Sequence, residues 1–304
     1  MNELELVEWA RDEATLSARS TEFTRAKIVQ LLNDQMRKVF NPLISNARAG
    51  YWLHTFTRQL GVGNPFVRLP ARAVPAIEQC DISNDSGRTW IAFDEAIEAE
   101  AQDCAEEARM YSWPQFYTLR GSYIYLINPT RIDTCMLRVK TVVKSSQIVE
   151  TQTAGLVTAV DHETRIITVN SMPVDRLNAN ATLSGTNIID CIEPRGNFER
   201  SLLSASATVL SSSTLQVAEG FSVARVEPGD YVRFEGQTDW PQLPEEFHTL
   251  LGSIAAIPIC RRRDLDTRAE RLAAASSDEL QRLKSYLLPR VRVDTHKPIQ
   301  HAWR

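Results

Sequence analysis

The spacing of apolar residues divides the chain into three stretches. In the first, apolar side chains recur at steps of three and four residues, which predicts an amphipathic helix that ends at Asn41 and Pro42. This stripe consists of Ile28, Leu31, Leu32, Met36, Val39 and Phe40. The pattern resumes from Leu43 to Tyr51, and an alanine- and glutamate-rich run predicts another helix over 94–109. Between these helices, two apolar runs separated by turn residues predict a short hairpin near 76–93.

From about residue 111 the pattern changes to short runs rich in β-branched and aromatic residues, with turn formers between them. Such regular spacing predicts an all-β module, either a sandwich or a small barrel. The expected strands are Tyr123–Ile127, Leu137–Val143, Gly155–Val160, Arg165–Val169, Ile188–Ile192, Ala207–Leu210, Thr214–Val217 and Tyr231–Phe234. The serines at 211–213 are expected at a hairpin tip, and Pro228 and Gly229 in the turn before the last strand.

The third stretch returns to helical spacing. Pro244 followed by two glutamates is a typical helix start, because proline suits the first turn and acids lie near the positive end of the helix. We expect Pro258 to end or kink this helix, and we predict a second helix over 264–288. After Pro289 no periodicity remains, so the last residues are expected to be extended.

Together these patterns predict an α+β fold in which helices from both ends form a bundle and an all-β sandwich or barrel is inserted between them. The predicted parts are a mainly helical 1–110, a β module at 111–237, C-terminal helices at 238–288 and an extended tail at 289–304.

Composition adds modest constraints. A hydrophobic content of 43% is typical of a folded globular chain, and the net charge of −4 gives no overall case for nucleic-acid binding. The charge is nevertheless uneven, with an acidic surplus before about residue 110 and basic residues towards the end. The N-terminus lacks the basic-then-apolar order of a signal peptide, and no apolar run spans about 20 residues, so we expect synthesis in a cytoplasm and no membrane contact. Five scattered cysteines are expected to be buried and reduced.

No catalytic or metal-binding motif is present. The chain lacks a phosphate-binding P-loop, a nucleophile elbow and the His or Cys spacing of zinc sites, so we expect no enzymatic activity and no cofactor. His248 lies within an amphipathic helix, where a histidine with satisfied hydrogen bonds is more common than a general base. Arg261, Arg262 and Arg263 form a basic cluster for a protein partner, solvent or DNA, but no aromatic-interleaved surface accompanies it.

Several short segments, in this order, resemble the head-to-tail adaptor proteins of tailed bacteriophages, especially the longer ones with a β insertion. After the helix that ends near Pro42, these segments are Phe66–Ala73, Phe116–Tyr123 leading to Pro129, Val226–Val232 and Trp240–Leu251. The resemblance covers nearly the whole chain, although each motif alone is short. One departure is Pro258–Arg263, where the family pattern has an uninterrupted alanine-rich stretch.

The resemblance implies a structural virion protein of the neck. Family members form a ring, usually of twelve copies, below the capsid portal, and genomic double-stranded DNA passes transiently through it. Their C-terminal segments commonly bind the portal, and a tail tube, nozzle or other tail protein lies below. Exposed tryptophans near both ends of this chain, Trp9 and Trp303, would suit such contacts, or they fold back onto their own domain.

The expected portal-binding segment is the tail after Pro289. In an extended chain its valines point to one side and its first arginines to the other, which suits addition of a strand to a neighbouring sheet. The residues involved are Arg290, Val291, Arg292, Val293, Lys297, Ile299 and Trp303. The alternative is a frayed terminus without function.

Two other functions stay open from the sequence. The chain could be another tail component, such as a tail-tube, nozzle or minor tail protein, with the same β-rich middle. It could also be a tail-associated carbohydrate-binding or carbohydrate-degrading module, which would require tryptophans and carboxylates clustered in the β region. Trp90, Trp113 and Trp240 only flank that region, so the sequence favours the adaptor.

Overall fold

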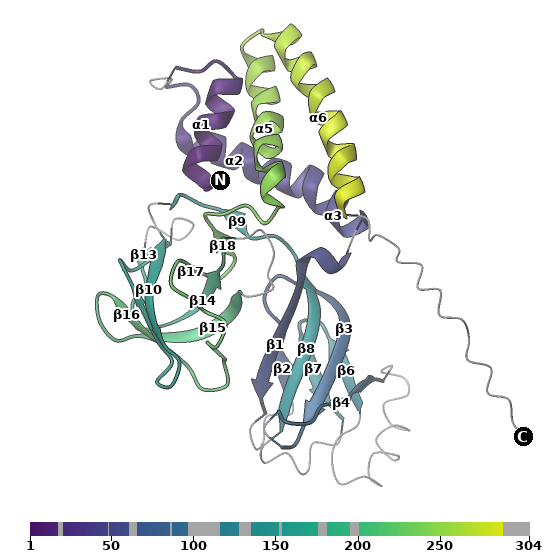
Figure 1. Ribbon diagram of the computed structural model, residues 1–304, viewed down its shortest axis with the longest axis vertical. Helices are drawn as coiled ribbons and strands as arrows, with labels where there is room; N and C mark the ends of the chain where they lie inside the picture. The colour runs from purple at the N-terminus through teal and green to yellow at the C-terminus, as the bar shows by residue number, and fades with distance from the viewer. Residues whose placement is uncertain are drawn as a thin grey trace, which may run out of the picture.

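The computed structural model describes residues 1–17, 21–47, 49–60, 66–85, 87–96, 116–127, 135–151, 154–175, 181–194 and 201–287. It is a mixed α+β fold with several sheets, one of which closes into a barrel. The helices form a layer at one end, and two β units lie side by side beneath it (Figure 1). The predicted α+β class, with a β barrel in the middle of the chain, is confirmed.

The helical layer combines segments from both ends of the chain. Its helices are α1 (Glu3–Glu13), α2 (Arg25–Gln35), α3 (Asn41–Ala47), α5 (His248–Arg262) and α6 (Asp266–Leu287), with the shorter turns η1 (Met36–Phe40), η2 (Ala49–Trp52) and η5 (Glu245–Phe247). Helix α5 packs against α1, α2 and α6, and all of them share one hydrophobic core. Asn2 caps α1 in a capping box with Glu5, and Thr24 caps α2.

Pro42 does not interrupt the helix, and Pro258 does not end α5. The Asn41 N–H donates to Met36 O, a five-residue step, so a π-helical turn carries α2 into α3. Pro258 lies inside α5, which continues to Arg262. A proline inside a helix costs about 3 kcal/mol, and here burial of the flanking residues in the helical core offsets that cost.

The first β unit consists of two four-stranded sheets that share one core. One sheet has the order β1-β8-β3-β4 and the other β2-β7-β6-β5. The strands are β1 (Leu53–Gln59), β2 (Phe66–Arg68), β3 (Ala73–Ser83), β4 (Ile91–Ala92), β5 (Asp94–Glu95), β6 (Phe116–Arg120), β7 (Tyr123–Leu126) and β8 (Met136–Val143). We call this unit the sandwich.

The sandwich corrects the prediction of a mainly helical stretch up to residue 110. Strands begin at Leu53, and the hairpin predicted near 76–93 exists as β3 and β4, but as part of a larger sheet. The helix predicted over 94–109 starts instead as strand β5, and its residues from 97 onward lie outside the described part of the chain. A strand forms here in place of a helix because β5 gains backbone pairing with β6 and borders the sandwich core.

The second β unit is a closed barrel with the strand order β10-β11-β16-β15-β14-β17. Its strands are β10 (Gly155–Asp161), β11 (Ile166–Val169), β14 (Thr186–Ile192), β15 (Leu202–Val209), β16 (Thr214–Val217) and β17 (Tyr231–Phe234). Alternating inward residues fill it, as β-branched runs with period two predict. The serine tip between β15 and β16 and the turn before β17 are where the sequence predicts them.

Short ribbons connect the barrel to its surroundings. The antiparallel pair β12 (Val174–Asp175) and β13 (Ala181–Thr182) lies beside the barrel, and β9 (Gln147–Ile148) pairs in parallel with β18 (Gln237–Thr238). The β9–β18 pair lies between the barrel and the helical layer (Figure 1). Ile148, Ile192 and Leu203 join the helical core, so the helices rest directly on the β units.

Candidate functional site

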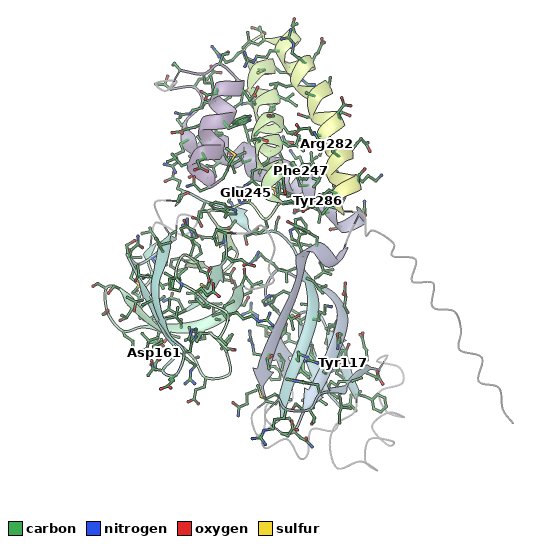
Figure 2. The ribbon with its side chains drawn as sticks, in the orientation of Figure 1. Tyr117, Asp161, Glu245, Phe247, Arg282 and Tyr286 are labelled. Carbon is green, nitrogen blue, oxygen red and sulfur yellow. The ribbon has the colours of Figure 1, made fainter. Side chains whose placement is uncertain are left out.

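The predicted portal-binding tail follows directly on α6. Arg290, Val291, Arg292, Val293, Lys297, Ile299 and Trp303 lie outside the described residues. The last described residue, Leu287, is fully buried, whereas its neighbour Tyr286 is 57% exposed. The centroids of the Tyr286 and Phe247 rings lie 5.8 Å apart in an edge-to-face arrangement. This aromatic pair lies at the end of α6, where the tail begins (Figure 2). The role of the tail in portal binding remains a prediction.

One arginine of the predicted basic cluster contacts the end of α1. Arg263 Nη1 donates to Ala14 O at 3.0 Å and to Thr15 O at 3.1 Å, which satisfies carbonyls at the C-terminal end of α1. Arg261 and Arg262 are exposed at the end of α5. Arg263 is therefore structural, and two arginines are left for a partner or DNA.

Trp9 and His248 have clear structural roles. Trp9 is 37% exposed, but its Nε1 donates to Ser253 Oγ at 3.1 Å, so this tryptophan folds back onto α5. His248 is fully buried and its two ring nitrogens contact the Met1 amino group at 2.9 Å and Leu243 O at 3.0 Å. Burial, together with the positive charge of Met1, lowers the pKa of His248 to about 4. The histidine is thus held neutral and occupied in hydrogen bonds, as the sequence predicts.

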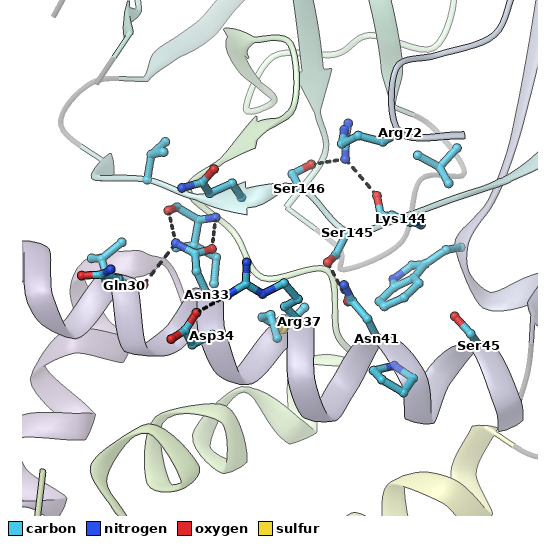
Figure 3. Close-up of a pocket in the computed structure, with 18 of the residues that line it drawn as sticks. Gln30, Asn33, Asp34, Arg37, Asn41, Ser45, Arg72, Lys144, Ser145 and Ser146 are labelled. Atoms are coloured by element: carbon cyan, nitrogen blue, oxygen red, sulfur yellow. Dashed lines mark hydrogen bonds and ion pairs between the residues drawn. The ribbon is translucent and has the colours of Figure 1, made fainter. Parts of the chain in front are cut away.

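A groove of about 890 Å³ runs between α2, α3 and the segment that links β8 to β9. Figure 3 shows that much of its polar wall is already paired. The Asn33 side chain accepts from Ile148 N at 2.7 Å and donates to Ile148 O at 2.8 Å, and Ser145 Oγ donates to Asn41 Oδ1 at 2.8 Å. These bonds fix the β8–β9 segment against the helical layer.

The outer face of the second sandwich sheet carries three clustered aromatic rings. Phe66 is 43% exposed and Tyr123 is 36% exposed, and their centroids lie 5.7 Å apart. Tyr125 lies 5.8 Å from Phe66, and the Arg120 guanidinium lies 5.4 Å from the Tyr125 ring.

The strand register places an arginine on each side of Tyr123. Tyr123 pairs with Arg68 of β2 on one side and with Arg120 of β6 on the other. We call Phe66, Arg68, Arg120, Tyr123 and Tyr125 the aromatic sheet face. These five residues come from three strands, so they form no continuous motif in the sequence. Only the alternation of Phe66 with Arg68, and of Tyr123 with Tyr125, hints at an outward face.

A buried charged cluster joins the helical layer to the barrel. The Glu3 carboxylate is fully buried, accepts from Arg25 and from Thr151 N, and its backbone N–H donates to Asp239 O at 2.9 Å. Arg233 and Asp239, both fully buried, lie 3.5 Å apart. Burial raises the pKa of Asp239, with Arg233 opposing that rise. These charges therefore link α1 to the barrel side and do not face solvent.

The described residues contain few groups suited to catalysis. Cys80, Cys135, Cys191 and Cys260 are buried, as predicted, and form no disulfide among the described residues, while Cys104 lies outside them. Burial raises the pKa of the Cys80 thiol. Within the described ranges, no three His, Cys, Asp or Glu side chains gather as a metal site would require. Of the helices in these ranges, none is both long enough and apolar enough to cross a membrane.

Comparison with models of known protein families gives no match, and comparison with curated proteins finds none either.

Proposed function

We propose that this protein is a structural subunit of a bacteriophage neck, a head-to-tail adaptor that forms a ring between the capsid portal and the tail. The proposal rests chiefly on the order of the short segments that resemble adaptors along nearly the whole chain. In this proposal the N- and C-terminal helices act as a bundle. The ring has about twelve copies, by analogy with the family, and genomic DNA passes through its centre.

The layout of the fold supports this proposal. Both chain ends contribute to one helical layer, and two β units project from the same side of it (Figure 1). A ring subunit needs separate surfaces for its neighbours, for the portal and for the tail, and this fold has exposed large hydrophobic residues on each part. They include Trp9 and Tyr286 on the helices, Phe66 and Tyr123 on the sandwich, and Ile188 and Leu210 on the barrel.

Portal binding by the tail is tested by removing residues 288–304. The truncated chain ends after Leu287, which is buried, so the helical layer should keep its fold. We expect the truncated protein to lose binding to its cognate portal in a pull-down and to be missing from assembled particles. The matched control replaces Arg271 and Arg282, two exposed arginines of α6 outside the basic cluster, with alanine and should bind normally. Normal portal binding by the truncated protein would contradict the proposal.

A carbohydrate-binding tail module is the second candidate, and the aromatic sheet face is the observation that favours it. Sugars stack on flat aromatic platforms, however, and these rings are tilted against one another by 80°, 40° and 53°. Tilted rings flanked by arginines are more typical of protein contacts, in which Tyr and Arg are enriched. A glycan array distinguishes the two functions: saturable binding to one glycan class that Tyr123→Ala abolishes would favour the carbohydrate module.

A further inference from the structure

A cavity of about 320 Å³ lies between the sandwich and the barrel. Strand β1 lies at the edge of its sheet, and this edge faces the barrel segments around 201–203 and 222–226. Figure 1 shows β1 and β15 as neighbours across this boundary. Both β units therefore contribute walls to one cavity.

The lining of this cavity is basic. Arg58, Arg138 and Arg225 reach it from three different segments, and His54 adds a fourth nitrogen-bearing side chain. Hydroxyl groups come from Thr55, Thr57, Ser201 and Ser222. No aspartate or glutamate is among the described residues that line it. A wall of cationic groups and hydroxyl donors without a carboxylate is suited to an anion.

Arg58 is the central residue of this cavity. Its guanidinium lies between two rings, 4.9 Å from Phe56 of the sandwich and 3.8 Å from Phe221 of the barrel. Its Nη1 donates to the carbonyl of the preceding Thr57 at 3.1 Å, and among the described residues no carboxylate pairs with it. Burial lowers the pKa of Arg58 to about 10. A partly buried cation without a counter-ion carries a desolvation cost, and a bound anion would offset that cost.

Arg138 shows the contrast within the same cavity. Its Nε and Nη2 donate to Asp81 Oδ2 at 3.0 and 2.8 Å, and its guanidinium lies 4.4 Å from the Trp90 ring. Asp81 therefore neutralises Arg138, whereas none of the carboxylates in the described residues pairs with Arg58. The unbalanced charge of the cavity is centred on Arg58.

We propose that this cavity binds a phosphate group, either as inorganic phosphate or as a small phosphate ester. Guanidinium groups match the oxygens of phosphate with several donors at once, and the two phenylalanine rings hold Arg58 in a fixed orientation. The volume lies at the lower end of the range for small-molecule sites, about 300–1,000 Å³, so it admits a phosphate with a small attached group. Because both β units line the site, a bound phosphate stabilises their contact.

The test is a calorimetric titration of the full-length protein with sodium phosphate at constant ionic strength, paired with thermal unfolding. We expect saturable binding and a rise in Tm that saturates with it. Arg58→Met removes the guanidinium but keeps a long apolar side chain, and Arg225→Met changes an exposed position in the cavity wall. Each should weaken phosphate binding roughly tenfold or more, because a hydrogen bond to a charged group is lost. Arg271→Met, an exposed arginine on α6, is the matched control and should bind as the unmodified protein does.

A second variant and a competition experiment complete the test. If Arg58→Met does not fold, Arg225→Met decides alone, because it lies in an exposed loop. Adenosine monophosphate should compete with phosphate, whereas a DNA duplex should not. Absence of saturable binding, an equal rise in Tm for all variants, or Arg58-dependent competition by the duplex would each overturn a site for a small phosphate.

Discussion

The Arg72 guanidinium donates to the Asp190 carboxylate at 2.8 Å, across the boundary between the sandwich and the barrel. Asp190 is fully buried and also accepts from Ser204 N and Gly236 N, each at 2.8 Å. Burial raises the pKa of Asp190, while Arg72 and the two N–H groups oppose the rise. Arg72 also donates to Lys144 O at 3.1 Å and to Ser146, so one side chain contacts the barrel and the segment leading to β9.

Arg72→Met should therefore loosen the junction. It leaves the buried Asp190 carboxylate without its counter-charge, and breaking a buried ion pair costs about 3–5 kcal/mol. We expect a loss of about 3 kcal/mol in the free energy of unfolding at pH 7, measured by urea denaturation. Arg37→Met is the control, since the Arg37–Asp34 pair is exposed on a helix and should contribute under about 1 kcal/mol. Equal losses for the two variants would mean that the Asp190 contact is unimportant.

His248 predicts a pH dependence of stability. Its pKa falls from 6.5 in the unfolded chain to about 4 in the fold, because burial and the Met1 charge disfavour the proton. Below about pH 6.5 the unfolded state takes up a proton that the folded state excludes until about pH 4. Stability should therefore decline as the pH falls through this window, by about 3 kcal/mol in total.

The measurement is the free energy of unfolding against pH for the natural protein and for His248→Gln. The variant should have a flatter profile between pH 6.5 and 4, although it is less stable at pH 7 because the buried contacts are disturbed. His162→Gln, in an exposed turn, is the control and should keep the original slope. A variant profile parallel to the original would show that other groups cause the acid sensitivity.

The sequence predicts the parts of this fold that depend on local pattern. The barrel strands and α5 are found because their apolar residues follow period two or 3.6 over the whole element. Strand β1 is missed because its inward residues are His54, Phe56 and Arg58, of which only one is apolar. Its pairing with β8 joins Leu53 to Val142, and such long-range pairing leaves no local signal.

The candidate sites were less predictable for the same reason. The aromatic sheet face and the basic cavity each combine side chains from several strands, so neither forms a motif in the sequence. Arg263 illustrates the opposite case. Its position in a run of three arginines suggests a binding surface, but the end of α1 uses its donors.

The contact between Gly252 and Trp9 predicts whether Gly252→Ala stabilises or destabilises the fold. A Cβ at residue 252 would lie 2.7 Å from Trp9 Cδ1, too close for any packed pair. Gly→Ala in a helix interior normally stabilises by about 1 kcal/mol, but here Gly252→Ala should destabilise by about 1–3 kcal/mol through overpacking. In a Trp9→Ala background the clash is absent, so the same change should become stabilising.

A double-mutant cycle of thermal or urea unfolding measures this coupling. The difference between the two effects of Gly252→Ala is the coupling energy between positions 9 and 252. Ser253→Ala removes the hydroxyl that accepts from Trp9 without filling the space, and thus separates the hydrogen bond from the packing. An unchanged effect of Gly252→Ala in both backgrounds would mean that Trp9 does not lie against α5.

The last prediction concerns assembly and follows from the proposed function. Exposed large apolar side chains in the described residues are spread over the helices, the sandwich and the barrel, and do not form one broad patch. Scattered side chains of this kind give weak contacts between two free copies. In a closed ring every copy repeats the same contact, and a portal template multiplies it further. We therefore expect the isolated protein to be a monomer or a weak oligomer and to form the complete ring only with its portal. Native mass spectrometry and sedimentation, with and without portal, measure this; a stable ring formed by the protein alone would rule out the need for a template.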